Sequence, residues 1–299
     1  MIRLLPALRR ALDAGEPVVA LESSVIAQGL PEPANRECVA RMTAAVTAAG
    51  ALAAIAAVAR GVPTLGLEPD ELERFYRREG VRKVSARDLP AAIAQGADGA
   101  TTVAATLALA HAAGVQVFAT GGIGGVHREP AFDESADLVE LARTPMIVVC
   151  AGAKAILDLA ATNERLETLG VPVIGYQTWD LPGFFTAETG LRVGARAESA
   201  GEIVRMFRAH LALGRTQALL VMQPPPAELA LPRVEVEAAV ARAIVRARAD
   251  GVRGAAATPY LLAAVTEVTQ GRSLQVNLAL LERNAGLAGE IAYTLTTAP

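Results

Sequence analysis

Short apolar runs alternate with amphipathic segments along almost the whole of this 299-residue chain, and no other feature constrains its fold as strongly. Apolar runs of about four to eight residues between turn residues are typical of buried strands. Strands that alternate with helices build α/β proteins around a central sheet. We predict strands at residues 17–22, 53–58, 62–67, 115–120, 146–153, 171–178 and 218–222, and helices at residues 34–49, 101–113, 234–249, 259–269 and 273–294.

The sequence therefore predicts a single domain over residues 1–299, with a central mixed β-sheet flanked by helices and a helical C-terminal third. No internal repeat, low-complexity tract or long polar linker divides the chain, which is long enough to bury a sizeable core. A hairpin is expected around Arg60 and Gly61. Hydrophobic residues make up 52% of the chain and aromatic residues only 4%, so we expect a core of alanine, valine and leucine.

Charge and cysteine content exclude several classes of protein. The net charge is −3 and the pI about 5.8, so nothing indicates binding to nucleic acid or to an anionic membrane. No apolar stretch reaches the roughly 18 residues of a membrane span, and the N-terminus lacks a signal-peptide pattern. Cys38 and Cys150 fall in apolar patterns and are expected to be reduced core residues. We expect a soluble cytoplasmic protein.

Only two lysines, Lys83 and Lys154, occur among the 28 basic residues of the chain. An amine can lose its proton, whereas a guanidinium effectively cannot. Only a neutral amine attacks a sugar or carbonyl carbon to form a Schiff base, and burial lowers the pKa of an amine toward that range. Two lysines in so arginine-rich a chain therefore indicate amine chemistry. The alternative is that both are surface residues left by drift.

Lys154 follows an apolar run over residues 146–153 that reads as a buried strand, and a helix is expected to begin near Ala155. Ligands of open α/β sheets bind at the carboxyl ends of the strands, which is where this amine would emerge. Lys83 lies on a short strand near residues 81–84, where a lysine is usually solvated. Asp88 is expected to cap a helix over residues 89–95.

Glu22 ends the first strand, directly before an irregular segment over residues 29–33. A carboxyl group in a half-apolar pocket has a raised pKa and can act as a general acid. An ion pair with an arginine is the alternative. Four glycines follow the strand at residues 115–120, and such loops let backbone N–H groups approach an anion. The spacing of these glycines fits neither a dinucleotide fingerprint nor a P-loop. His127 either closes this loop or contacts substrate.

Three carboxylates lie within five residues, at Asp133, Glu134 and Asp137. Such a cluster can offer oxygen ligands to a hard divalent cation, and the lack of histidine or cysteine partners favours magnesium or manganese over zinc. Alternatively, these acids occupy a helix N-terminus, where the helix dipole favours negative charge.

Taken together, the motifs resemble the pseudouridine-5′-phosphate glycosidases, a family whose relatives include proteins named indigoidine synthase A. The resemblance spans about residues 17–292. Its motifs are Leu21-Glu22-Ser23-Ser24-Val25-Ile26 with Gly29-Leu30-Pro31, Lys83-Val84-Ser85 with Arg87-Asp88-Leu89, Gly99-Ala100-Thr101-Thr102-Val103, the glycine loop through His127-Arg128, residues 133–138, Cys150-Ala151-Gly152-Ala153-Lys154, and Asn277 with Asn284-Ala285.

The resemblance implies a hydro-lyase type of glycosidase that reversibly converts pseudouridine 5′-phosphate and water to uracil and ribose 5-phosphate. It implies that Lys154 is the nucleophile, that Glu22 is the acid and that Asp133 binds one manganese ion per subunit of a homotrimer. The substrate contacts implied by the resemblance are Lys83, Val103, Ser135, Ala136, Asp137 and Asn277.

Two segments depart from the family pattern, at Ala27-Gln28 and in a shortened loop over residues 127–133, and both bear on base recognition. Two other functions remain open. A Schiff-base aldolase or lyase for another sugar phosphate would keep Lys154 but place no demand on Glu22. A non-catalytic sugar-phosphate binding protein would form no covalent intermediate.

Overall fold

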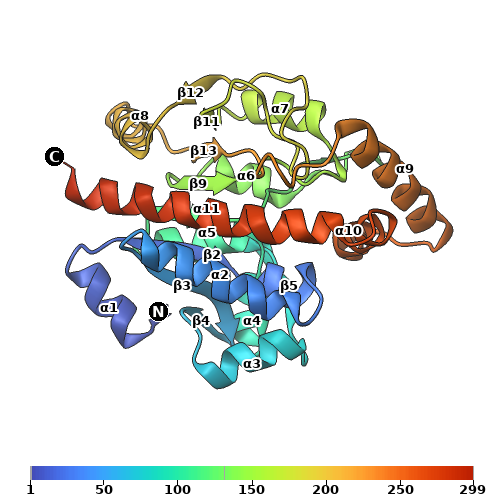
Figure 1. The fold of residues 1–299 in the computed structure, drawn as a ribbon. Coiled ribbons are helices and arrows are strands. Elements are labelled where there is room, and N and C mark those ends of the chain that lie inside the picture. The colour runs from blue at the N-terminus through green and yellow to red at the C-terminus, as the bar shows by residue number, and fades with distance from the viewer. Residues whose placement is uncertain (1, 131, 299) are drawn as a thin grey trace.

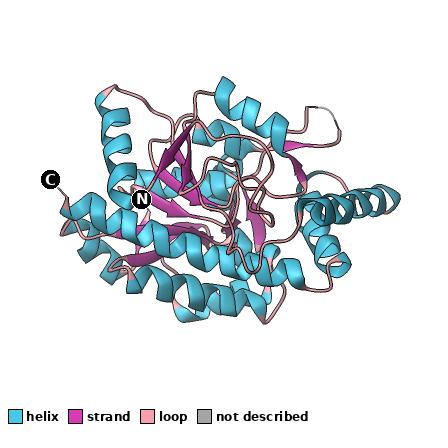
Figure 2. Cartoon of the chain, turned by 45° about the horizontal axis from the view of Figure 1, so that its top comes forward, coloured by secondary structure: helices cyan, strands magenta, loops and turns pink. Residues whose placement is uncertain are grey.

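Most strands of the described residues join in one large sheet (Figures 1 and 2). A computed structural model describes residues 2–130 and 132–298, and 11 strands of these residues belong to the sheet. In spatial order its main path is β1 (Arg3–Leu4), β4 (Val62–Leu65), β3 (Leu52–Ala59), β2 (Val18–Glu22), β7 (Val117–Ala119), β9 (Ile147–Cys150), β13 (Leu219–Met222), β11 (Val173–Tyr176) and β12 (Ala195–Ala197). Beside β3 lie β6 (Gly99–Thr101) and β5 (Arg82–Val84), whereas β8 (Val126–His127) and β10 (Leu157–Asp158) form a separate pair.

The sheet is mixed, as predicted. From β3 through β2, β7, β9, β13 and β11 to β12 all neighbours are parallel, whereas β3 pairs antiparallel with β4 and β6. The expected hairpin is confirmed, because Ala59 of β3 pairs with Val62 of β4. The chain passes from β2 to β3 on one side, and β7 later adds on the other side of β2. Ligands of open α/β sheets bind at such reversals of strand order, outside the carboxyl ends of the strands.

Helices cover both faces of this sheet. Figure 1 shows α2, α11 and α8 side by side in front of the sheet and α5 and α6 behind it, which agrees with the contacts between these elements. The α-helices are α1 (Pro6–Asp13), α2 (Ala34–Ala48), α3 (Pro69–Arg77), α4 (Leu89–Ala94), α5 (Val103–Ala112), α6 (Ala136–Leu141), α7 (Leu159–Thr168), α8 (Ala200–Ala212), α9 (Arg233–Ala249), α10 (Ala257–Val268) and α11 (Arg272–Thr297), and the shorter helical turns are η1 (Val25–Gly29), η2 (Ala86–Asp88) and η3 (Gly254–Ala256). The predicted α/β class and helical C-terminal third are confirmed.

Several predicted boundaries are wrong. Residues 154–156 form no helix, because the chain first adds β10 to β8, and α7 begins only at Leu159. Asp88 occupies the N-cap position of α4, as predicted, but its side chain makes no capping hydrogen bond to that helix; its carboxylate accepts the Ser85 N–H at 3.0 Å and closes the turn η2. The helix expected from residue 101 begins at Val103, because residues 99–101 pair with β3 and β5.

The core has the expected composition, with small aliphatic side chains on the strands and helices. Cys38 and Cys150 are buried and free, as predicted, and burial raises the pKa of the Cys150 thiol to about 12. Among the described residues no helix has the length and apolar character needed to cross a membrane.

Helix α11 packs closely on α2, and a glycine allows this approach. A Cβ at Gly289 would lie 2.7 Å from Cβ of Ala49 and 3.2 Å from the carbonyl oxygen of Val46. At Gly286, one turn earlier, the nearest atom to an added Cβ is Cβ of Ala45, at an ordinary 3.9 Å. An added Cβ would therefore be overpacked at Gly289 but accommodated at Gly286.

Gly289→Ala should lower the free energy of unfolding, because overpacking costs about 1–3 kcal/mol and outweighs the gain in helix propensity. Gly286→Ala should raise it by up to about 1 kcal/mol, since only the propensity gain acts there. Denaturant unfolding of the two variants checks this. Equal stability of both variants would contradict the close approach at Gly289.

Candidate active site

Glu22 is buried at the carboxyl end of β2, with 6% of its surface exposed. The register pairs Leu21 with Ala119, which brings Glu22 beside Thr120 just after β7. The hydroxyl of Thr120 donates to Oε1 of Glu22, and the hydroxyl of Ser24 donates to Oε2. Both partners are hydroxyls that can pass on a proton. The alternative of an arginine partner is not seen among the described residues.

Helix α11 binds Thr120, the residue whose hydroxyl donates to Glu22. Nδ2 of Asn284 donates to the carbonyl oxygen of Thr120 at 2.9 Å, so α11 fixes the turn after β7. Thr120 is not among the site residues predicted from the sequence, and Asn284 was predicted only as part of a motif, without a role. A strand-end hydroxyl one residue past Ala119 was the available signal for Thr120, but the sequence does not show that β7 lies next to β2.

Lys154 lies four residues after the end of β9, against the glycine loop. Its N–H donates to the carbonyl oxygen of Ile123 at 3.0 Å, and its Nζ donates to the carbonyl oxygen of Gly122 at 2.6 Å. Gly152, two residues earlier, has a φ of 92°, and a Cβ there would collide with the carbonyl oxygen of Pro182. The turn therefore requires a glycine, and it aims the half-buried amine along the loop.

Lys83 is half-buried on β5, and the electrostatics place it in the same site as Lys154. Burial lowers the pKa of the Lys83 amine, and the positive charge of Lys154 lowers it further, whereas the carboxylates of Asp137 and Glu22 raise it. A charged side chain shifts the pKa of another group appreciably only when the two groups lie close together. The hydrogen bonds of the site agree with this, because Thr120, Gly122 and Gly124 of the loop after β7 hydrogen-bond with Glu22, Lys154 and Asp137 in turn.

Asp137 joins three segments at this site. Its Oδ1 accepts the Ala104 N–H of α5 at 2.9 Å, and its Oδ2 accepts the Gly124 N–H of the glycine loop at 2.8 Å. The hydroxyl of Ser135 caps α6 by accepting the Asp137 N–H at 3.2 Å. Gly124 is needed here, because a Cβ would lie 2.7 Å from the Asp137 carboxylate.

The remaining predicted substrate contacts lie at helix starts and on α11. Val103 is the first residue of α5, and its side chain is buried. A substrate contact of Val103 would therefore use its backbone. Ala136 is the exposed first residue of α6. N–H groups at helix starts lack partners within the helix and suit anions. Asn277 is buried on α11, two turns before Asn284 and on the same face.

Three buried polar atoms near these segments have no hydrogen-bond partner among the described residues. They are Oε1 of Gln28, Oγ1 of Thr102 and Oδ1 of Asn284. Buried polar atoms are normally paired, so an unpaired one is a position where water or a ligand can bind. Gln28 belongs to the departure from the family pattern, and its Nε2 donates to the carbonyl oxygen of Val81 at 3.4 Å, on the segment that leads to Lys83.

His127 and Asp133 connect this cluster to a cavity of about 500 Å³ that also contacts Arg248 and Arg253. Burial lowers the pKa of His127; Asp133 raises it, and Lys83 and Lys154 lower it. The imidazole therefore interacts electrostatically with both lysines and with Asp133, which lines the same cavity. Residue 131, in the shortened loop, lies outside the described residues.

The three carboxylates of the acidic motif do not converge, which corrects the prediction made from their spacing. Asp137 is bound by backbone N–H groups, Glu134 pairs with Arg165 at 2.9 Å, and Asp133 lies near His127. No three His, Cys, Asp or Glu side chains within residues 2–130 and 132–298 form a metal-binding group. Asp133 is the carboxylate of the three whose side chain remains available to a cation.

The sequence model of the family described as Indigoidine synthase A like protein matches residues 7–294. The chain belongs to this family. Two relatives are named pseudouridine-5′-phosphate glycosidase: one from Gemmatimonas aurantiaca, 64% identical over 95% of this chain and 93% of its own, and one from Escherichia coli K12, 48% identical over 98% of this chain and 95% of its own. The predicted resemblance is confirmed, and with it the expectation of an enzyme.

Two solved structures share the fold, each with a TM-score of 0.91 over 99% of this chain and 97% of its own. One is the prealnumycin C-glycosynthase AlnA in complex with ribulose 5-phosphate, at 38% identity. The other is an indigoidine synthase A-like protein from Thermotoga maritima, at 36% identity. Both extend over almost the whole sheet and helix arrangement described above.

The lowered pKa of Lys83 makes stability depend on pH. Between that native pKa and the ordinary value of 10.5, the unfolded chain binds more protons than the folded chain, so stability should rise with pH in this window. Lys83→Met removes the effect. The free energy of unfolding of the wild type minus that of Lys83→Met should therefore increase as pH rises through the window.

Arg82→Met is the matched control, because Arg82 neighbours Lys83 on β5 and stays charged throughout. Its difference from the wild type should be flat over the same pH range. An equally flat difference for Lys83→Met would show that the amine is not desolvated.

Proposed function

We propose that the protein cleaves the C–C glycosidic bond of pseudouridine 5′-phosphate to uracil and ribose 5-phosphate, reversibly and through an imine on Lys154. The observation that carries the proposal is that Glu22, Lys154 and Asp137 hydrogen-bond to Thr120, Gly122 and Gly124 of one loop after β7, and that Lys83 interacts electrostatically with all three. The names of relatives at up to 64% identity supply the substrate. The C-glycosynthase at 38% identity supports reversibility and the sugar-phosphate class.

The amine opens the sugar. Nζ of Lys154 bonds to C1′ while the C1′–O4′ bond breaks and O4′ takes up a proton. The hydrogen bond from Nζ to the Gly122 carbonyl oxygen positions the amine for this attack. Asp137 lies in the same cluster and is proposed to move the proton to the ring oxygen.

The base leaves in a second step. A C–C glycosidic bond offers no basic leaving heteroatom, so C5 of uracil has to gain a proton as the C1′–C5 bond breaks. Glu22 is proposed to supply that proton, and its contacts with Thr120 and Ser24 offer a route for replacing it. The bonding electrons go to C5 of the base, and Nζ and C1′ are left as an imine, which water hydrolyses to ribose 5-phosphate and free Lys154.

The phosphate is proposed to bind Lys83 and the N–H groups at the starts of α5 and α6, near Val103, Ser135 and Ala136. Asn277 completes the proposed substrate contacts. We also propose that Asp133 holds a divalent cation, manganese in the family pattern. A single carboxylate fits such an ion, since hard cations commonly take their remaining ligands from water and phosphate. The bound cation would neutralise phosphate charge. The homotrimer remains a prediction.

Glu22→Gln should lower uracil release by about 10²- to 10⁴-fold, the usual effect of removing a positioned acid. It should still allow borohydride to trap ribose 5-phosphate on Lys154, because the amide keeps the shape of the site and removes only the proton. Uracil release and the mass of the Lys154 peptide are the measurements.

Lys154→Ala is the comparison, and it should lose both uracil release and trapping. A Glu22→Gln variant that releases uracil at the wild-type rate, or that also loses trapping, would contradict the acid role. Trapping by the wild type without any uracil release would favour the aldolase or lyase alternative.

Removal of divalent cations by a chelator should abolish turnover, and manganese should restore it. In Asp133→Ala the bound manganese, followed by electron paramagnetic resonance, should disappear at concentrations that saturate the wild type. Glu134→Gln should keep its manganese, because Glu134 pairs with Arg165. Full activity of the wild type in chelator with no bound metal would overturn the metal proposal.

A further inference from the structure

Arg128 belongs to the glycine-loop motif, and the function proposed above gives it no role. Its guanidinium reaches the segment that follows Lys154. Nε donates to the carbonyl oxygen of Leu157 at 3.1 Å, and one terminal nitrogen donates to the carbonyl oxygen of Ala155 at 3.4 Å. The planar fork of arginine fits this use, because it presents several N–H donors in fixed directions.

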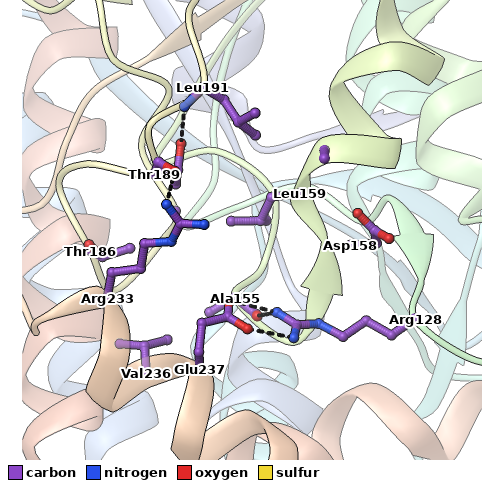
Figure 3. A pocket seen from close by; sticks show the side chains of 12 residues that line it. Arg128, Ala155, Asp158, Leu159, Thr186, Thr189, Leu191, Arg233, Val236 and Glu237 are labelled. Carbon is purple, nitrogen blue, oxygen red and sulfur yellow. Dashed lines mark hydrogen bonds and ion pairs between the residues drawn. The ribbon is translucent and has the colours of Figure 1, made fainter.

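A bidentate ion pair holds the guanidinium in place. The two terminal nitrogens of Arg128 donate to the two carboxylate oxygens of Glu237 on α9, at 2.7 and 2.9 Å. The guanidinium lowers the pKa of Glu237, so the carboxylate is charged at neutral pH. Figure 3 shows the two side chains meeting beside Ala155, at the wall of a cavity of about 360 Å³.

We infer that Arg128 and Glu237 are positioning residues that clamp the turn at residues 154–157 and so fix the Lys154 amine for attack on the sugar. The backbone already ties this turn at one end, where the Lys154 N–H donates to Ile123 and the Leu157 N–H donates to the Lys154 carbonyl oxygen at 2.9 Å. Arg128 ties the other end to α9. The clamp rests on the imine function proposed for Lys154.

The strand pairing explains why the clamp acts on Lys154 and not only on the fold. Leu157, the last residue of the turn, pairs with His127 where β10 meets β8. Arg128 is the next residue after His127, so it is held beside the end of the turn. A shift of this turn moves the backbone of Lys154 relative to Gly122, which accepts the Nζ hydrogen bond. Misplacement of a reacting group by about 1 Å can cost about 10²-fold in rate.

Glu237→Gln tests the clamp, and Glu235→Gln is its matched control. Glu235 lies on the same helix and also binds both terminal nitrogens of an arginine, but its partner is Arg272 at the start of α11 and not a residue of the glycine loop. Glu237→Gln should lower kcat and the rate of borohydride trapping by a common factor of about 10–100, with KM little changed. Glu235→Gln should leave both rates at the wild-type value.

Chemical rescue separates positioning from stability. Arg128→Ala should lose more activity than Glu237→Gln, and guanidinium ion at low, non-denaturing concentration should restore part of it, because the cavity beside Arg128 admits a small cation. Arg128→Lys should not restore the rate, since an ammonium cannot reach both carbonyl groups and Glu237 in one plane. Guanidinium should not stimulate the wild type or Lys154→Ala.

Hydrogen exchange of the Leu157 amide gives a readout that does not depend on catalysis, and this amide should exchange faster in Glu237→Gln and Arg128→Ala than in Glu235→Gln. Unchanged exchange, or equal loss of rate in Glu235→Gln and Glu237→Gln, would overturn the clamp. Failure of the proposed imine function would give a different result. Lys154→Ala would then release uracil at the wild-type rate, independently of how fast the Leu157 amide exchanges.

Discussion

The buried carboxylate of Asp137 is the interaction on which the site depends, because it joins segments that the chain keeps far apart. It accepts N–H groups from Ala104 and Gly124, and so sets the spacing between the start of α5 and the glycine loop. A buried charge is tolerated only when donors of this kind satisfy it. The same loop offers the Gly122 carbonyl to Lys154, so the position of the amine follows from the Asp137 hydrogen bonds.

Amines and guanidinium groups divide their tasks in this protein. The pKa of the Lys83 amine is lowered by burial and by the charge of Lys154 and raised by the carboxylates of Asp137 and Glu22. Arginine is used where a fixed fork is needed, as in the bidentate pair of Arg128 with Glu237. A guanidinium in place of either lysine would stay charged and could not act as a nucleophile. The scarcity of lysine is thus consistent with the chemistry proposed for the site.

Local sequence patterns predicted many of the helices and strands, but they failed for elements whose existence or boundaries depend on pairing with a distant segment. The long helices α2, α9 and α11 and the buried strands were readable because their periodicity is a property of neighbouring residues. Helix α3 was missed although Pro69 at its first position, followed by Asp70 and Glu71, is a sequence signal for a helix start. The start of α7 was misplaced by four residues, because the intervening strand β10 exists only through its pairing with β8. Helix α8 was missed as well.

The sequence by itself determined the α/β alternation, the family membership and the residue types available for chemistry, because these depend on composition, local spacing and motif order. Only the tertiary structure decided which of these residues meet. It brought Thr120 to Glu22 across 98 positions and Asn284 to Thr120 across 164, and it separated Asp133, Glu134 and Asp137, which are neighbours in the chain. The physical reason is that strand order and helix packing set these contacts. Both depend on how distant segments bury their apolar faces against each other, and the local sequence of one segment does not specify its partner.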